Sequence, residues 1–218
     1  KASLEKMRTK KLLLAAVIGA ACIASSSAQV FSLNVVGYVN KVLGPGLHLI
    51  ANPLDNQGGN AVGDLIPGDV PAGTVLFSWN GSGWVQHRLI AGNWIPSAEL
   101  NPGTGFFISI PSGGEASLTF VGEVPQGSLS VPLPLGLSLV SSVVPQEVAI
   151  ANSAGLAEIG LSVESGDLMF SWNGSGWVQH RLIGANIIPA KTLAVGEGFF
   201  FQNNQDAAKS WDRDFEVN

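Results

Sequence analysis

The feature that most constrains the fold of this chain is a segment of fourteen residues that occurs twice. Residues 77–90 read FSWNGSGWVQHRLI, and residues 170–183 repeat the same letters. Looser matches follow each copy: NWIP and NIIP at residues 93–96 and 186–189, and GTGFF and GEGFF at residues 103–107 and 196–200. Repetition on this scale indicates that one structural unit is built twice. We therefore predict two tandem repeats of about 90 residues, at residues 29–120 and 121–218.

The composition of the chain favours a β-rich globular protein. Glycine provides 27 of the 218 residues, which disfavours long helical bundles. Only 12% of the residues are charged and 46% are hydrophobic, whereas disordered chains combine high charge with low hydrophobicity. A single cysteine excludes a disulfide scaffold.

Each predicted repeat consists of short strands separated by turn residues. Strands are expected at residues 35–42, 46–51, 74–80, 84–90, 106–110 and 117–124, and helical turns at residues 61–66 and 151–161. Asn80-Gly81 between two strands is a hairpin signal because both residues accept positive φ, and the hairpin would place Trp79 opposite Trp84. Strands at this spacing predict an all-β fold of two tandem β-sandwich or barrel-like repeats with short helical turns.

The N-terminal segment has the three parts of a secretory signal. A basic stretch, KMRTKK, is followed by the apolar run LLLAAVIGAACIA and by small residues that end at Ala28. We predict a signal peptide over residues 1–28, with residues 1–6 upstream of Met7. A membrane anchor, for which the run is short of the about 20 residues required, and a lipoprotein signal ending at Cys22 are the alternatives. Export to the cell surface or medium is expected, with the periplasm as the alternative.

Removal of this leader leaves an acidic chain with no cysteine. Five of the 11 basic residues and one of the 16 acidic residues lie in the leader. An acidic exported protein is repelled by polyphosphate backbones and anionic headgroups. We therefore expect no nucleic-acid partner and no membrane insertion after cleavage of the signal.

The sequence carries no motif of a known catalytic type. It has no G-x-S-x-G elbow, H-E-x-x-H, P-loop or dinucleotide fingerprint. Strand alternation places His87 on a mostly apolar face, which predicts a packed or hydrogen-bonded histidine, with a ligand or metal contact as the alternative. The acids near the C-terminus, Asp206, Asp212, Asp214 and Glu216, lack calcium-loop spacing and predict a solvated edge. We expect no enzyme activity, no metal and no cofactor.

A ligand-binding hypothesis is based on the aromatic and polar residues that both copies of the repeat contain. Tryptophan faces beside planar hydrogen-bonding groups suit sugar rings, and two copies would raise avidity. The alternative is that these tryptophans serve core and cross-strand packing while the arginines are solvated. The candidate residues are Trp79, Trp84, Gln86, Arg88, Trp172, Trp177, Gln179 and Arg181.

The ends of the chain suggest a mode of assembly. The predicted strand at residues 117–124 joins the two repeats, and residues 33–39 and 213–217 would supply its two halves at the chain ends. These terminal strands either pair within one molecule, which we expect, or join successive molecules head to tail. The candidate assembly residues are Val35, Val36, Tyr38, Val39, Phe215 and Val217.

Several motifs occur together in order along the chain: VVGYVN, GLHLIANPLDN, the FSWNG hairpin, PGTGFF and GEGFF, FVGEVPQG and WDRDFEVN. This set resembles uncharacterised secreted proteins of the Verrucomicrobia and Planctomycetes type of bacteria, over essentially the whole mature chain. The resemblance implies export and surface residence but supplies no reaction. We expect a structural or adhesive protein that contacts itself or other surface proteins. The alternative is a carbohydrate-binding module for neutral polysaccharide.

Overall fold

The computed structural model describes residues 35–66 and 68–217. The predicted signal peptide lies outside these residues. The model is nearly all β, with 53% strand and 5% helix, arranged in several antiparallel sheets. The predicted all-β class is therefore confirmed.

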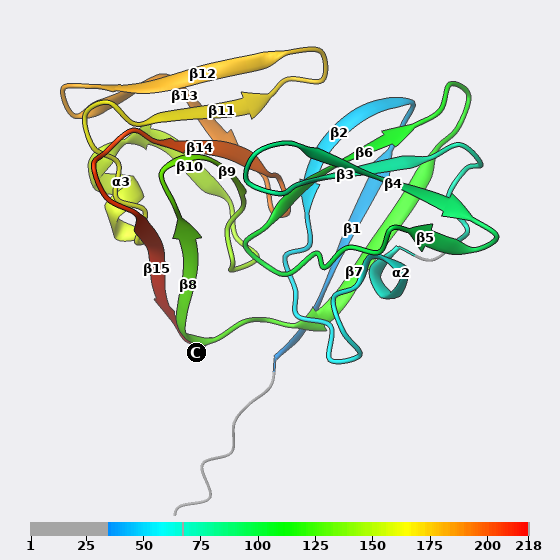
Figure 1. Ribbon diagram of the computed structural model, residues 1–218. Helices are drawn as coiled ribbons and strands as arrows, with labels where there is room; N and C mark the ends of the chain where they lie inside the picture. The colour runs from blue at the N-terminus through cyan, green and yellow to red at the C-terminus, as the bar shows by residue number, and fades with distance from the viewer. Residues whose placement is uncertain (1–34, 67, 218) are drawn as a thin grey trace, which may run out of the picture. The chain divides into compact units, whose positions relative to one another are not determined.

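The strands and helices fall into two halves, residues 36–123 and residues 127–215 (Figure 1). The first half contains β1 (Val36–Leu43), β2 (Gly46–Ala51), α2 (Val62–Leu65), β3 (Val75–Trp79), β4 (Trp84–Ile90), β5 (Asn93–Ile95), β6 (Gly105–Ile110) and β7 (Ala116–Glu123). The second half contains β8 (Gly127–Leu133), β9 (Gly136–Val140), β10 (Val148–Asn152), α3 (Ser153–Glu158), β11 (Leu168–Trp172), β12 (Trp177–Ile183), β13 (Asn186–Leu193), β14 (Phe199–Asn203) and β15 (Lys209–Phe215).

Strands follow the same order in both halves. The first half has a five-stranded sheet in the order β2-β6-β3-β4-β5 and a separate ribbon of β1 and β7. The second half has a six-stranded sheet in the order β9-β14-β11-β12-β13-β10 and a ribbon of β8 and β15. Strand β10 is the one addition. The duplicated sequence thus produces the same strand order twice.

The predicted Trp hairpin is confirmed by the strand register. Trp79 lies opposite Trp84, and Trp172 lies opposite Trp177. The turn between β3 and β4 differs from the expected one, because Gly81 has positive φ (94°) and Asn80 does not. Instead, the side-chain Oδ1 of Asn80 accepts hydrogen bonds from the backbone N–H groups of Ser82 (3.0 Å) and Gly83 (2.8 Å).

Each half encloses its own hydrophobic core, to which both its large sheet and its ribbon contribute. In the first half, Phe106 on β6 and Phe120 on β7 are fully buried in one cluster. In the second half, Phe199 on β14 and Trp211 on β15 are buried in another. Strand alternation directs one side of each sheet to its core, so the other side remains available for further contacts.

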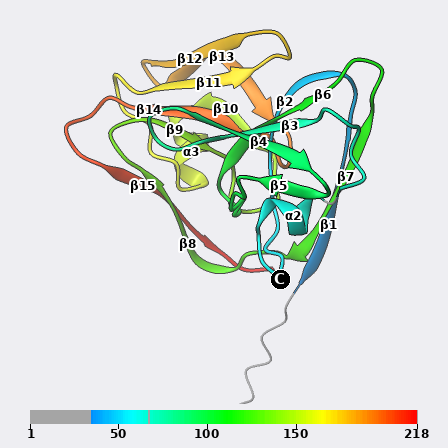
Figure 2. The same ribbon diagram turned by 45° about the vertical axis from the view of Figure 1, so that its right-hand side comes forward.

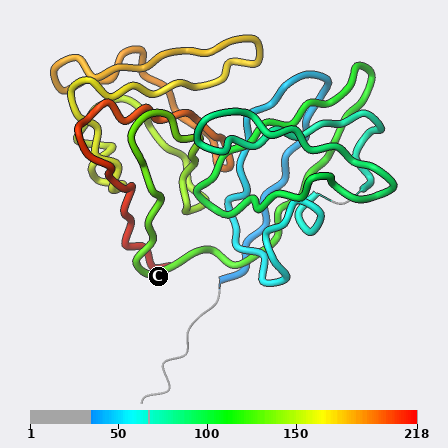
Figure 3. The backbone as a smooth tube through the Cα atoms, viewed as in Figure 1, coloured from blue at the N-terminus to red at the C-terminus, as the bar shows by residue number. Residues whose placement is uncertain are grey.

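The expectation that the two terminal strands pair with each other is wrong. Strand β1 pairs with β7 and β15 pairs with β8, both antiparallel, as the chain trace shows (Figures 2 and 3). The predicted shared strand also proves to be two elements, because β7 ends at Glu123 and a new strand begins at Gly127. The physical reason is local: each ribbon strand turns one face toward the core of its own half, which buries Leu43 of β1 and Trp211 of β15.

Candidate functional site

The two Trp hairpins meet across the boundary between the halves. The indole Nε1–H of Trp79 donates to the carbonyl oxygen of Leu137 at 3.1 Å, and that of Trp172 donates to the carbonyl oxygen of Leu47 at 2.9 Å. Leu137 is the counterpart of Leu47, because both follow a glycine at the start of the strand after the first ribbon strand. The two hydrogen bonds are therefore a reciprocal pair, one from each copy of the fourteen-residue segment.

Six aromatic rings form one cluster around this boundary. Trp84 has its ring centroid 5.3 Å from that of Phe107 and 5.7 Å from that of Phe200. Trp177 lies 5.6 Å from Phe107 and 5.2 Å from Phe200. Both tryptophans therefore contact the same two phenylalanines, one from each half. Edge-to-face and tilted geometries of this kind contribute about 0.5–1.5 kcal/mol a pair beyond the area buried.

The remaining two indoles extend the cluster in the same reciprocal way. Trp79 packs edge-on against Trp84 and Phe200, with centroid separations of 5.2 Å in each case. Trp172 packs edge-on against Trp177 and Phe107, both at 5.3 Å. The rings of Trp79, Phe107, Trp172 and Phe200 also belong to a third hydrophobic cluster, distinct from the two cores, which includes Leu47, Leu49, Leu137 and Leu139.

Two glycines allow the backbones to approach at the centre of this cluster. A Cβ added to Gly198 would stand 3.2 Å from the Cα of Gly105, and one added to Gly105 would stand 3.4 Å from the Cα of Gly198. Backbone hydrogen bonds flank the crossing, from Ala51 N–H to the Gly196 carbonyl and from Ser141 N–H to the Gly103 carbonyl, each 3.0 Å long. The G-x-G-F-F repeat therefore supplies the close approach and the aromatic side chains together.

The cluster is hollowed into an open apolar pocket of about 280 Å³. Trp84 and Trp177 are 43% and 41% exposed. Trp79 and Trp172 are only half-buried as well, but their N–H groups are already bonded across the boundary. The pocket is lined by Leu47, Phe77, Trp84, Phe107, Trp172 and Trp177.

Polar side chains lie beside the pocket on the same strand faces. Gln86 and Arg88 are exposed together with Trp84, as the alternation of β4 predicts, and Gln179 and Arg181 are exposed on β12. The Nη2 of Arg88 approaches the Oε1 of Gln86 at 3.5 Å. All four side chains are exposed to solvent.

The structure thus brings the sequence-predicted residues to one surface, but it divides their roles. Trp84 and Trp177 are the exposed rings, whereas Trp79 and Trp172 hold the halves together. Phe107 and Phe200, whose rings contact both exposed indoles, are not among the residues predicted from the sequence. The signal for them was available in the repeated G-x-G-F-F motif: alternation sends the first Phe to the core and the second to the opposite face.

The two repeated histidines are buried and hydrogen-bonded, as predicted for His87. His87 Nε2 lies 2.8 Å from the Ser78 hydroxyl and its Nδ1 lies 2.7 Å from the Pro96 carbonyl. His180 makes the matching contacts with Ser171 (2.8 Å) and Pro189 (2.6 Å). A Ser–His pair can activate a nucleophile only where substrate reaches the hydroxyl, and both histidines here are closed off from solvent.

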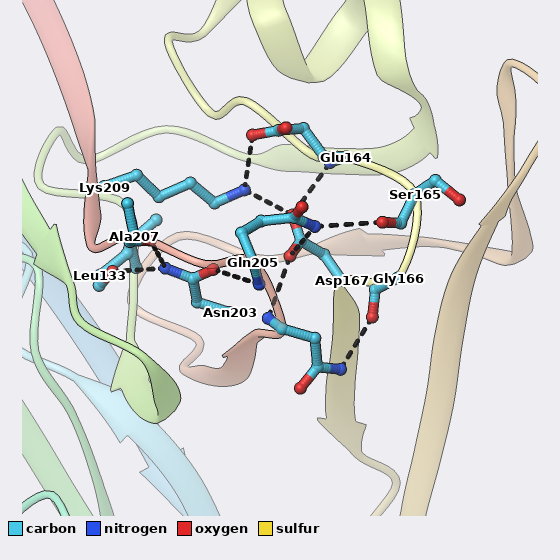
Figure 4. A network of polar contacts seen from close by, with 10 residues as sticks. Leu133, Glu164, Ser165, Gly166, Asp167, Asn203, Gln205, Ala207 and Lys209 are labelled. Carbon is cyan, nitrogen blue, oxygen red and sulfur yellow. Dashed lines mark hydrogen bonds and ion pairs between the residues drawn. The ribbon is translucent and has the colours of Figure 1, made fainter.

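A second polar site belongs to the core of the second half (Figure 4). The carboxylate of Asp167 is buried and receives hydrogen bonds from Lys209, from the Glu164 backbone N–H (2.9 Å) and from the Gln205 side chain (3.0 Å). Burial raises the pKa of Asp167, but these donors outweigh it and hold the pKa below its usual value. The counterpart in the first half is Thr74, whose hydroxyl bonds the Pro71 carbonyl at 2.7 Å. The network therefore fastens the loop that contains Glu164 and Asp167 to the segment that contains Gln205 and Lys209.

Carboxylates elsewhere do not gather into a metal site. Within residues 35–66 and 68–217, no group of three or more His, Cys, Asp or Glu side chains could hold a metal ion. Asp212, predicted to lie on a solvated edge, is exposed and accepts hydrogen bonds from Ser130 (2.6 Å) and Ser210 (2.7 Å), which hold its pKa below the usual value. In the same part of the chain, every helix is too short to cross a membrane.

The aromatic pocket is therefore the best candidate for a functional site in the described chain. It is an apolar concave surface, and exposed polar side chains lie on the same strand faces as its two exposed indoles; apolar pockets with a few polar groups are the common form of a ligand site. No family model, no curated protein and no solved structure matches this chain.

Proposed function

We propose that this chain is an exported, non-catalytic adhesive protein whose aromatic pocket binds neutral polysaccharide. The observation that carries the proposal is the pair of exposed indoles, Trp84 and Trp177, that rest on the same two phenylalanines. The C–H face of a pyranose ring stacks on an indole, and its hydroxyl groups bond outward to planar donors and acceptors. Gln86, Arg88 and their counterparts on β12 are in position for those outward bonds.

The rigidity of the cluster favours recognition over loose surface contact. Each exposed indole is buttressed by three other rings, and the reciprocal indole-to-carbonyl bonds fix the hairpins that carry them. Preorganised rings lose little conformational freedom when a ligand binds. Two equivalent indoles on one surface also suit a polymer that presents the same ring repeatedly.

The charge of the chain favours a neutral ligand. After the expected loss of the leader, acidic residues outnumber basic residues by more than two to one. A polyanionic chain would be repelled at long range. The absence of charge on a neutral polysaccharide removes that barrier, and the two arginines beside the indoles can still donate to hydroxyl oxygens.

Electrophoresis through gels that contain a soluble neutral polysaccharide tests the proposal. We expect at least one of a β-glucan, a xylan, a galactomannan and an α-glucan to retard the protein. Trp84→Ala and Trp177→Ala should each weaken the retardation about tenfold or more, if a sugar ring gains from an indole as much as a stacked nucleic-acid base does, about 1–3 kcal/mol. The matched controls Ile90→Ala and Ile183→Ala alter exposed residues on the same strand faces and should behave as wild type.

Two outcomes would contradict the proposal. One is a wild-type protein that no neutral polysaccharide retards. The other is retardation that persists unchanged in the folded Trp84→Ala/Trp177→Ala double variant. Thermal unfolding of each variant separates loss of binding from loss of fold.

A further inference from the structure

Within residues 35–66 and 68–217, the strand edges that have no partner strand differ in how they are protected against pairing. Unpaired strand edges recruit other strands unless they are short, charged, bulged, covered or interrupted by proline. The edges of β2 and β9 are covered by isolated bridges from the opposite half, Ile50 to Glu197 and Val140 to Thr104. Strand β7 is bridged at Glu123 by Asp55. These three edges are closed to a further strand at those points.

The remaining edges, apart from one, carry other protective features. Strand β5 is only three residues long, and β10 contains a shift of register. Strand β15 exposes Asp212 and Asp214. Strand β8 contains Pro132, which has no N–H to donate.

Strand β1 is the least protected of these edges among the described residues. It is eight residues long, contains no proline, and pairs with β7 on one side only among the described residues (Figures 1 and 2). Its one charged residue, Lys41, is half-buried on the inner face, where burial lowers its pKa and Glu197 opposes that shift. This inward-pointing charge is the single protective feature that β1 carries.

The outer face of β1 is apolar, in contrast to the same face of its counterpart β8. Val36, Tyr38 and Val42 are 66%, 68% and 67% exposed. Strands β1 and β8 are aligned through Leu43 and Leu133, the last residue of each strand. In this alignment Ser128 corresponds to Tyr38, and Pro132 corresponds to Val42. Two strands with the same place in the fold therefore present opposite surfaces.

The free backbone groups of β1 belong to these same outward residues. The Val124 N–H bonds the Val35 carbonyl at 2.8 Å, which marks Val35 as a hydrogen-bonded position of the ladder. Because such positions alternate in an antiparallel pair, residues 36, 38, 40 and 42 direct their N–H and C=O groups away from β7. A partner strand at this edge would gain backbone hydrogen bonds and apolar side-chain contacts from the same four residues.

We propose that β1 pairs antiparallel with β1 of a second copy of this chain, about a two-fold axis at Val39. This register places Val36 opposite Val42 of the partner and Tyr38 opposite Asn40 of the partner. Each of the four outward residues then finds a partner for both its N–H and its C=O, which no other register achieves. Lys41 faces Gly37 of the partner, so no like charges oppose each other.

The second copy is the occupant that these features favour. The edge offers four outward residues of which three are apolar, and β1 itself supplies an extended partner of the same length and pattern. The resulting sheet, in the order β7-β1-β1-β7, would join the two ribbons and set the exposed apolar side chains of one β1 beside those of the other. Neither exposed indole of the aromatic pocket takes part in this sheet, so dimerisation and ligand binding are separable.

Sedimentation equilibrium of the purified protein over a range of concentrations tests this pairing. We expect the wild-type protein to form a dimer of twice the chain mass. For Val42→Pro we expect the dissociation constant of the dimer to rise about tenfold or more, which corresponds to about 1.4 kcal/mol of association free energy. This variant introduces at the β1 edge the residue that β8 tolerates at the matching position, so the fold has a precedent for it. Tyr38→Lys, at a highly exposed residue, should weaken the dimer by placing two like charges near the axis.

The matched control is Ser128→Ala on β8, which should leave the dimer unchanged. A wild-type protein that stays monomeric at millimolar concentration would overturn the proposal. An unchanged dissociation constant in both Tyr38→Lys and folded Val42→Pro would also overturn the proposal. Loss of the dimer in Ser128→Ala would overturn it as well. Circular dichroism establishes folding, and Tyr38→Lys keeps the test decisive if Val42→Pro does not fold.

Discussion

At the residue scale, the repeated segment is explained by the number of contacts its side chains make. Trp79 bonds the opposite half, Trp84 faces the pocket, and His87 joins Ser78 to the Pro96 carbonyl. Both faces of β4 make contacts: one face carries the buried His87, and the other carries Trp84. Composition and alternation predicted the two faces of β4, but they could not reveal that the outer face meets its own copy.

Removing one hydroxyl tests the buried serine–histidine pairs. Ser171→Ala leaves His180 Nε2 buried without its partner, so the free energy of unfolding should fall by about 1–3 kcal/mol. Urea denaturation measures the loss. Ser175→Ala, at the exposed hairpin tip of the same segment, serves as the control and should change stability by less than about 0.5 kcal/mol. Equal effects of the two substitutions would contradict the role assigned to the pair.

Acid should weaken the Asp167 network selectively. The folded-state pKa of Asp167 lies below its usual value, so its contribution to stability is present above the unfolded pKa of about 3.9 and is lost as pH falls through the folded pKa. Asp167→Asn should therefore be less stable than wild type at pH 7, and the difference should shrink as pH falls toward 2. Asp206→Asn, at an exposed neighbour, is the control. A difference between Asp167→Asn and wild type that does not depend on pH would contradict this account.

At the scale of elements, the sequence predicted the strands and hairpins well because their signals are local. The expected strands at residues 46–51 and 84–90 match β2 and β4. The pairing of the terminal strands could not be predicted, because it depends on which core each ribbon covers. Core packing could not be predicted from the repeat either. Ile66 and Ile159 are equivalent positions in the two halves, but the Ile66 carbonyl accepts a hydrogen bond from the indole N–H of Trp94 on β5. The Ile159 carbonyl accepts one from the indole N–H of Trp211 on β15.

The hairpin tip gives a prediction at this scale. The Asn80 Oδ1 holds the turn by accepting from two backbone N–H groups, so Asn80→Ala should lower the unfolding free energy by about 1–2 kcal/mol. Asn173→Ala should do the same at the second hairpin. Ser82→Ala removes only the hydroxyl contact with Asn80 and should have a much smaller effect in the same urea titration. If Asn80→Ala left the free energy of unfolding unchanged, the backbone conformation of Gly81 alone would determine the turn.

At the scale of the whole described chain, we expect the shared aromatic cluster to make the two halves unfold as one cooperative unit. Fluorescence of the clustered tryptophans and far-ultraviolet circular dichroism should therefore report coincident unfolding. Gly198→Ala, which brings a methyl group against Gly105 and Leu49, should destabilise the protein by about 1–3 kcal/mol. Gly44→Ala, where the added methyl group meets no atom within 4 Å, should be neutral. Two separate transitions in the wild type would contradict the shared cluster.

The most direct test of the central claim, that the two copies of the segment form one binding surface, is the nuclear magnetic resonance of the six tryptophan indole N–H groups. Neutral oligosaccharides of the β-glucan, xylan, mannan and α-glucan series are added in turn. The account predicts that one series shifts the signals of Trp84 and Trp177 together, while Trp94 and Trp211, bonded within the two cores, stay in place. Unchanged Trp84 and Trp177 signals in every series, or a shift in only one of the two, would contradict it.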